Sequence, residues 1–208
     1  MSDDAEYRKS VRNMSIILAA IVLTIFAAIF LPPILAPAHE QFESSSTTAS
    51  PFGFTLNLKT NSTSLNPGSA VLITSWLNST SPQLTNVTAA SEWPIGPAGL
   101  WIRPCVAGWP LGIGLMQGYY TSDNFTSGTL LRIPTPLSSC PVPAQGPSFF
   151  ILKPFSTSAL VVTGGSGVTM DLASTLTFRS GTAPSPGVYT VVAADEWGDA
   201  VLVHFVLH

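Results

Sequence analysis

The densest group of potential metal-binding side chains lies in the sequence Asp195-Glu-Trp-Gly-Asp199. Asp195, Glu196 and Asp199 carry carboxylate oxygens, the ligands that Ca²⁺ prefers in proteins. Their spacing differs from the D-x-D-x-D-G pattern of a calcium loop. A short connection between two strands is also where solvated charges usually lie. We therefore interpret the three carboxylates as a solvated turn.

Two histidines could supply half of a metal site. His204 and His208 are four residues apart in an apolar segment with the pattern of a strand, so they share one face. A blue-copper site would also need a histidine shortly after a cysteine and a methionine nearby, and Cys140 is followed by neither. Ordinary edge-strand histidines are the favoured interpretation, and no cofactor is expected.

Two further motifs could have indicated catalysis. A Ser-His-Asp triad is not supported, because the chain lacks a G-x-S-x-G elbow and its third histidine, His39, lies far from the other two in sequence. The run 164–167 (GGSG) lacks the Lys-Ser/Thr ending of a phosphate loop, and we expect a flexible loop there. The sequence predicts a protein that is not an enzyme.

The chain has two cysteines, Cys105 and Cys140, each followed or preceded by proline. In an oxidising compartment their default state is one disulfide, which would contribute about 3–4 kcal/mol by loop-closure estimates. Metal ligation or a reactive thiol is the alternative, but no CxxC or Cys-His spacing supports it.

Four N-x-S/T sequons make N-glycosylation plausible if this part of the chain is exported. Their acceptor residues are Asn61, Asn78, Asn86 and Asn124. Glycans would supply solubility that charges do not, since charged residues make up only 9% of the chain against about 25% in typical domains. The shortage of Lys and Arg also argues against nucleic-acid binding.

A group of aromatic residues in the middle of the chain could contact a sugar or another protein. It comprises Trp93, Trp101, Trp109, Tyr119 and Tyr120, with Phe125 nearby. The same residues could instead form a small core beneath a long insertion. Both alternatives stay open, and the small core is the favoured one.

The segment that places all of these groups is the apolar run 14–36. Residues 14–31 carry no charge and would span roughly 27 Å as a helix, close to the ~30 Å core of a bilayer. Arg8, Lys9 and Arg12 precede the run, so the positive-inside rule predicts residues 1–13 as a cytoplasmic tail and the rest as extracytoplasmic.

Two other interpretations of this run remain open. The sequence Ala36-Pro37-Ala38 could be a signal-peptidase site, although the run is longer than a usual signal sequence. A pilin-type signal, cut before the hydrophobic helix, would instead send that helix into a filament core. An uncleaved transmembrane anchor in the cell membrane is the working prediction.

Beyond the run, residues 37–51 are predicted as a Ser/Thr-rich flexible stalk, and 52–208 as a β-sandwich. Short β-rich segments alternate with Gly, Pro, Asn and Ser, and no helical periodicity appears. A Pro/Gly/Trp-rich insertion is predicted around 92–147, where prolines argue against a central strand.

The end of the chain is the clearest β pattern. Gly187 to Ala194 and Ala200 to Leu207 are predicted as the two strands of a hairpin. Ser185-Pro-Gly-Val-Tyr189 matches the tyrosine corner of immunoglobulin-like sandwiches. The predicted fold is therefore an all-β, antiparallel, immunoglobulin-like β-sandwich preceded by one N-terminal transmembrane helix.

The ending PGVYTVVAADEWGDAVLVHFVL resembles the C-terminal hairpin of membrane-anchored archaeal surface proteins with immunoglobulin-like outer domains. The resemblance covers about 25 residues and the order of anchor, stalk and sandwich. The composition, rich in Ser and Thr and poor in charge, is similar to that of glycosylated envelope proteins of thermoacidophilic archaea. The resemblance implies a fold and a location rather than an activity.

These observations predict a single-pass cell-envelope protein that presents a glycosylated domain for non-covalent interaction. Its partners would be the membrane and other envelope proteins or glycans, or copies of itself. A structural subunit of an extracellular filament or surface layer is the alternative. An accessory subunit of a membrane complex is a further one.

Overall fold

The computed structural model describes residues 42–91, 93, 100–102, 108–131, 146–182 and 185–208. Residues 42–208 form one compact unit. Its described part contains strands and two short 3₁₀ turns, so the predicted all-β class is confirmed. No helix among the described residues is long and apolar enough to cross a membrane. The predicted tail (1–13) and membrane span (14–36) lie outside them.

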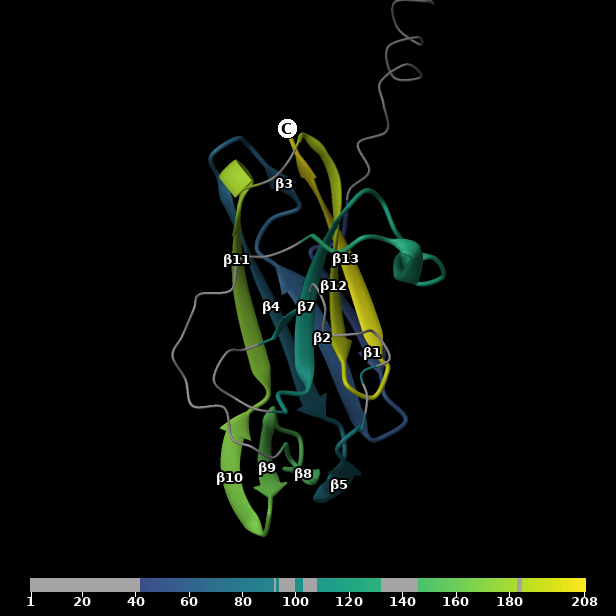
Figure 1. The fold of residues 1–208 in the computed structure, drawn as a ribbon, viewed down its shortest axis with the longest axis vertical. Coiled ribbons are helices and arrows are strands. Elements are labelled where there is room, and N and C mark those ends of the chain that lie inside the picture. The colour runs from purple at the N-terminus through teal and green to yellow at the C-terminus, as the bar shows by residue number, and fades with distance from the viewer. Residues whose placement is uncertain (1–41, 92, 94–99, 103–107, 132–145, 183–184) are drawn as a thin grey trace, which may run out of the picture. The chain divides into compact units, whose positions relative to one another are not determined.

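The described strands form three sheets, which Figure 1 labels by strand. Sheet A has the order β1-β2-β4-β11, with the bounds Ser45–Ala49, Phe54–Thr60, Ala70–Ser79 and Ala173–Arg179. Sheet B has the order β3-β13-β12-β7-β6, with the bounds Ser64–Leu65, Ala200–Leu207, Gly187–Asp195, Leu111–Gln117 and Trp101–Ile102. Sheet C has the order β10-β9-β8-β5, with the bounds Ser166–Asp171, Ser158–Thr163, Phe149–Leu152 and Thr85–Thr88. All pairings are antiparallel except that of β3 with β13. The 3₁₀ turns are Phe125–Ser127 and Ser180–Thr182.

Sheets A and B pack face to face, with β2 lying against β12 and β13. Alternate residues of each strand point into the shared core, as the period of two requires. Leu56 and Ile73 of sheet A meet Ile113, Val191 and Phe205 of sheet B there, all fully buried. Each such side chain contributes roughly 1.5–3 kcal/mol of burial free energy. This core confirms an antiparallel sandwich.

Sheet C extends sheet A at one end, because two strands run on from one sheet to the other (Figure 1). β4 leads through a short loop into β5, and only Leu172 separates β10 from β11. The carbonyl of Leu172 accepts a hydrogen bond from the Leu77 N–H in sheet A, and its own N–H donates to the Thr157 carbonyl beside sheet C. Leu172 is fully buried and joins the two sheets.

The C-terminal hairpin is confirmed, with Gly187 opposite Leu207 and Ala194 opposite Ala200. The predicted tyrosine corner is confirmed as well. The Tyr189 hydroxyl donates to the Ser185 carbonyl at 2.6 Å, and the ring is fully buried. This contact fixes the chain where it enters β12.

Three local expectations are wrong. β7 is a central strand of sheet B although prolines precede it. Pro110, the nearest of them, lies just before Leu111, which is the first paired residue of the strand, so the proline takes no part in the pairing. Residues 45–49, predicted as stalk, form the edge strand β1, since Ser and Thr pair with β2 through their backbones without an apolar pattern. The run 164–167 is not a flexible loop: Gly164 and Gly165, both with positive φ, form the two-residue turn between β9 and β10.

Candidate functional site

At the turn between β12 and β13, Asp195 and Glu196 are buried and Asp199 is half-buried, which corrects the prediction of a solvated turn. Asp195 is 0% and Glu196 4% exposed. The turn packs beneath the loop that follows β5, and the Glu196 N–H donates to the Pro110 carbonyl at 3.1 Å. Backbone donors and neighbouring aromatic rings replace the water that the sequence pattern had implied.

Asp195 receives two backbone hydrogen bonds from its own turn. Its Oδ1 accepts from the N–H groups of Trp197 and Asp199, each at 3.0 Å. Its Oδ2 and the Oδ2 of Asp199 are buried without a hydrogen-bond partner among the described residues. Burial, and then the nearby charge of Asp199, raise the pKa of Asp195 to about 7.

Glu196 ties the turn to the chain after β5. Its Oε1 accepts a hydrogen bond from the Ala90 N–H at 3.0 Å. Burial raises the pKa of Glu196 to about 7, and the Ala90 hydrogen bond opposes that rise. The turn therefore holds two carboxyl groups that gain and lose protons near neutrality.

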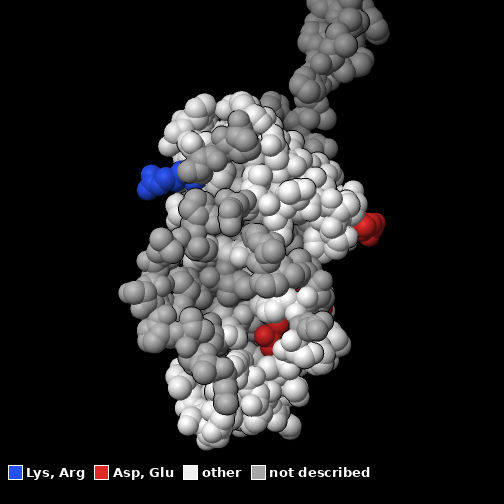
Figure 2. Space-filling view, viewed as in Figure 1, with Lys and Arg blue, Asp and Glu red and all other residues white. Residues whose placement is uncertain are grey.

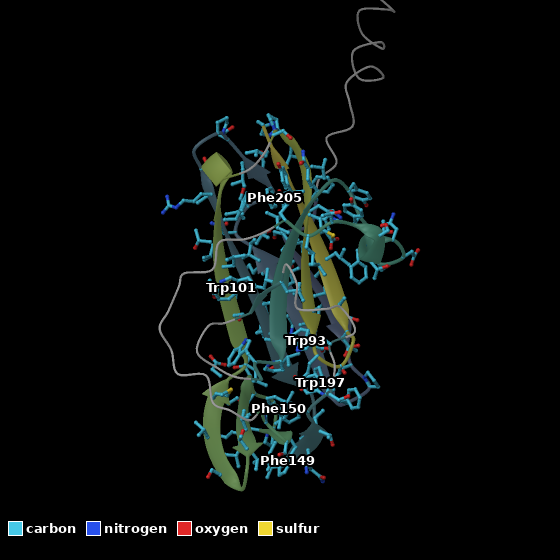
Figure 3. All side chains as sticks on the ribbon, in the orientation of Figure 1. Trp93, Trp101, Phe149, Phe150, Trp197 and Phe205 are labelled. Atoms are coloured by element: carbon cyan, nitrogen blue, oxygen red, sulfur yellow. The ribbon has the colours of Figure 1, made fainter. Side chains whose placement is uncertain are left out.

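Trp197 connects this turn to sheet C. Its indole Nε1 donates to the carbonyl of Thr88, the last residue of β5, at 2.8 Å. Its ring lies 5.2 Å from that of Phe54 in sheet A. It also lies 5.5 Å from that of Phe150 in sheet C, and Figure 3 labels both Trp197 and Phe150. The expectation that Trp197 packs rather than projects is confirmed. The segment 195–199, named here the acidic turn, thus joins all three sheets.

The two predicted histidines have separate partners. His204 Nε2 lies 2.7 Å from the Tyr120 carbonyl, and its ring stacks on Tyr119 at 4.4 Å. His208 Nε2 lies 2.9 Å from the Ser64 hydroxyl. Within the described residues, no group of three or more His, Cys, Asp or Glu side chains has the arrangement of a metal site.

The aromatic group of the middle section does not form one contact surface. Trp101 and Trp109 are buried in the main core, where the Trp109 indole Nε1 donates to the Ser174 hydroxyl at 3.1 Å. Trp93 and Tyr120 pack on a second, smaller core on the opposite side of sheet B. Tyr119 alone of the five is largely exposed, at 53%. Four of the five rings are thus buried or half-buried, in agreement with the small-core alternative.

Glycines in β7 make this second core possible. A Cβ on Gly114 would lie 2.5 Å from Leu130 and 2.9 Å from Leu100 and Val192. A side chain there would displace the residues that cover sheet B. The middle section thus supplies both a central strand and the cover over that strand.

Three exposed apolar residues lie on neighbouring loops, which the sequence analysis missed. Phe52, Leu84 and Phe155 are 43%, 66% and 69% exposed. The Thr80 N–H donates to the Gly53 carbonyl, and the Phe155 N–H donates to the Ser81 carbonyl, so backbone bonds connect the three loops. These residues are named here the apolar loop cluster. A large apolar residue within two positions of a Pro or Gly was the signal that could have identified each loop.

Phe155 has an unusual backbone conformation, with φ of +44°. Positive φ is a genuine outlier for a bulky residue and costs roughly 1–2 kcal/mol. The strained residue carries an aromatic ring that is 69% exposed. Such a position favours a role in contact over a role in folding.

The sequon asparagines all lie in the described structure. Asn61, Asn86 and Asn124 are exposed, and Asn78 is half-buried on β4. The face in Figure 2 carries few charged side chains among the described residues, in keeping with the composition. Cys105 and Cys140 lie outside the described residues, so their disulfide stays a prediction.

Comparison with known proteins gives no family. No protein-family model matches the chain, and no curated protein does. Among solved structures, β-glucosidase from Listeria innocua is similar in its complexes with gluconolactone and with isofagomine, at 13% and 12% identity. Each match has a TM-score of 0.30 and covers 73% or 76% of this chain but only 16% or 17% of that one. A likeness this low says nothing about function.

Proposed function

We propose that this chain is a single-pass cell-envelope protein that presents a glycosylated, immunoglobulin-like sandwich for non-covalent contact. The uncharged run 14–36 and its basic N-terminal flank support the anchor. The Tyr189 corner and the two-sheet core support the immunoglobulin-like assignment. The resemblance of the last hairpin to archaeal surface proteins agrees with both.

The apolar loop cluster carries the proposal of contact. Its three side chains are the kind that soluble domains bury, and one of them is held outward at a cost in backbone strain. β1 lies between Phe42 and Phe52, so the cluster is at the opposite end of that strand from the first described residue. The chain enters the domain away from the surface that would meet a partner.

A filament or surface-layer subunit is the second candidate, and β10 favours it. β10 is an edge strand of sheet C, and five of its six residues are exposed, Val168 at 64%. An edge of this kind can accept a strand from another copy of the chain. In that case residues 14–36 would pack between subunits.

Crosslinking in intact cells separates the two candidates. In the envelope protein, crosslinked products should depend on the loop cluster. They should be lost in a Leu84→Ser, Phe155→Ser double variant and kept in Val168→Lys, which only disfavours pairing at the β10 edge. The reverse pattern, with homo-oligomeric products, would support the filament subunit.

The native N-terminus provides the second measurement. A chain that retains residues 1–12 and leaves the membrane only in detergent supports the anchor. A chain that begins near residues 11–15, or at His39, would instead show cleavage and support a filament or secreted subunit.

A further inference from the structure

The outer face of sheet A brings one sequon next to an aromatic side chain. Trp76 and Asn78 are two residues apart on β4, and the buried residues Ser75 and Leu77 alternate with them. Both therefore point away from the core, about 7 Å apart along the strand. Both are half-buried.

The pairing of β4 with β11 ends at Trp76, and beyond it the Ser79 N–H donates to the Ser156 carbonyl. Trp76 lies opposite Asn57 on β2 and opposite Ala173 on β11. Ala173 is the first residue of β11 in this pairing, so no β11 residue is paired with Asn78. Within the described residues, the Asn78 side-chain amide has no hydrogen-bond partner, and only its backbone carbonyl accepts from Thr55.

We infer that the first sugar of an N-glycan on Asn78 packs against the indole ring of Trp76. The apolar C–H face of a pyranose suits an aromatic ring, and the hydroxyls at its edge suit the amide and hydroxyl side chains beside it. Asn57 and Thr74 are the polar neighbours of Trp76 on this face. The glycan thereby covers the part of the outer face of sheet A on which Trp76 and Asn78 are half-buried. The inference rests on the proposed export and glycosylation.

The other three sequons lack this arrangement. Two residues before Asn61, Asn86 and Asn124 lie Lys59, Leu84 and Ser122, none of them aromatic. Their asparagines are exposed, so their glycans would extend into water. Asn78 is the one sequon of the four where a sugar would add buried contact, and hence stability.

Two matched variants of the full-length glycosylated protein test this. Thr80→Ala removes the Asn78 sequon but keeps Trp76 and Asn78, and Thr88→Ala removes the Asn86 sequon in the same way. We expect Thr80→Ala to lower Tm by about 2–4 °C, as the loss of a modest packing contact does in a domain of this size. Thr88→Ala should change Tm by less than about 1 °C. In a Trp76→Leu background, Thr80→Ala should have no further effect.

A second measurement needs no change at Trp76. The rate of Trp76 oxidation by hydroxyl radicals, followed by peptide mass spectrometry, should rise several-fold in Thr80→Ala. Equal oxidation rates, or a Tm loss that persists in Trp76→Leu, would overturn the packing.

Site occupancy distinguishes this inference from the proposed function. Glycans on Asn61, Asn86 or Asn124 but none on Asn78 would overturn the packing and leave the glycosylated domain standing. Unmodified asparagines at all four sequons would overturn both.

Discussion

The acidic turn and the apolar loop cluster lie side by side, yet the burial of their side chains is the reverse of what side-chain polarity predicts. Asp195 and Glu196 are buried, whereas Leu84 and Phe155 stand in solvent. The two regions meet where the ring of Phe52 lies 6.3 Å from that of Trp197. At this end of the sandwich, two carboxyl side chains are buried while three large apolar side chains are exposed.

The difference shows that backbone donors, rather than side-chain polarity, decide what is buried here. Asp195 and Glu196 together accept three backbone N–H groups, two from the turn itself and one from the chain after β5. Those donors offset part of the cost of removing a carboxyl group from water. In the apolar loop cluster, backbone groups of the three loops hydrogen-bond to one another, and the apolar side chains stay exposed to solvent.

The largest effect should come from removing the ring that joins the two regions to sheet C. Trp197→Ala is expected to lower the free energy of unfolding by about 3–5 kcal/mol, because three aromatic neighbours and the Thr88 hydrogen bond are lost. Phe155→Ala, also a truncation of an aromatic side chain, should change it by less than about 0.5 kcal/mol. Chemical denaturation of both variants measures this. Equal losses would show that the cluster is part of the fold and not a free surface.

The buried carboxyls make stability depend on pH. The pKa of Asp195 rises from 3.8, and that of Glu196 from 4.5, to about 7 in the folded protein. The folded state therefore binds protons more tightly than the unfolded state. Their contribution is complete below about pH 4 and is lost as the pH rises through about 7. Thermal unfolding at a series of pH values should show the free energy of unfolding falling by several kcal/mol between pH 4 and pH 8.

Asp195→Asn provides the control for this pH dependence. The amide keeps an acceptor oxygen for the Trp197 and Asp199 N–H groups but has no proton to lose. The variant should be more stable than wild type at pH 8 and should have a flatter pH profile. Asp123→Asn, at an exposed position, should follow the wild-type profile. A wild-type profile that rises toward pH 8 contradicts the buried acidic turn.

The two regions also differ in how far the sequence could predict them. The alternation in Gly187 to Leu207 predicted the hairpin, and the Pro-Gly before Tyr189 predicted its corner, because both depend on local contacts. The burial of Glu196 depends on Ala90 and Pro110, which lie more than 80 residues before it in the chain. β7 was missed for a similar reason, since Gly112 and Gly114 suit a strand only when Leu100 and Leu130 cover it. The alternation of apolar residues and the residues typical of turns predict strands and hairpins, whereas contacts between residues far apart in sequence decide which side chains are buried.

The smallest effect concerns the strained residue of the apolar loop cluster. Phe155→Asn should raise the free energy of unfolding by about 0.5–1 kcal/mol, because asparagine tolerates positive φ and little packing is lost at an exposed site. The same variant should weaken the crosslinks assigned to the cluster. Phe52→Asn, in the same cluster but not at a positive-φ position, should give no such gain. If Phe155→Asn is instead destabilising, its ring is packed for folding, and the contrast between a buried acidic turn and an exposed contact surface no longer holds.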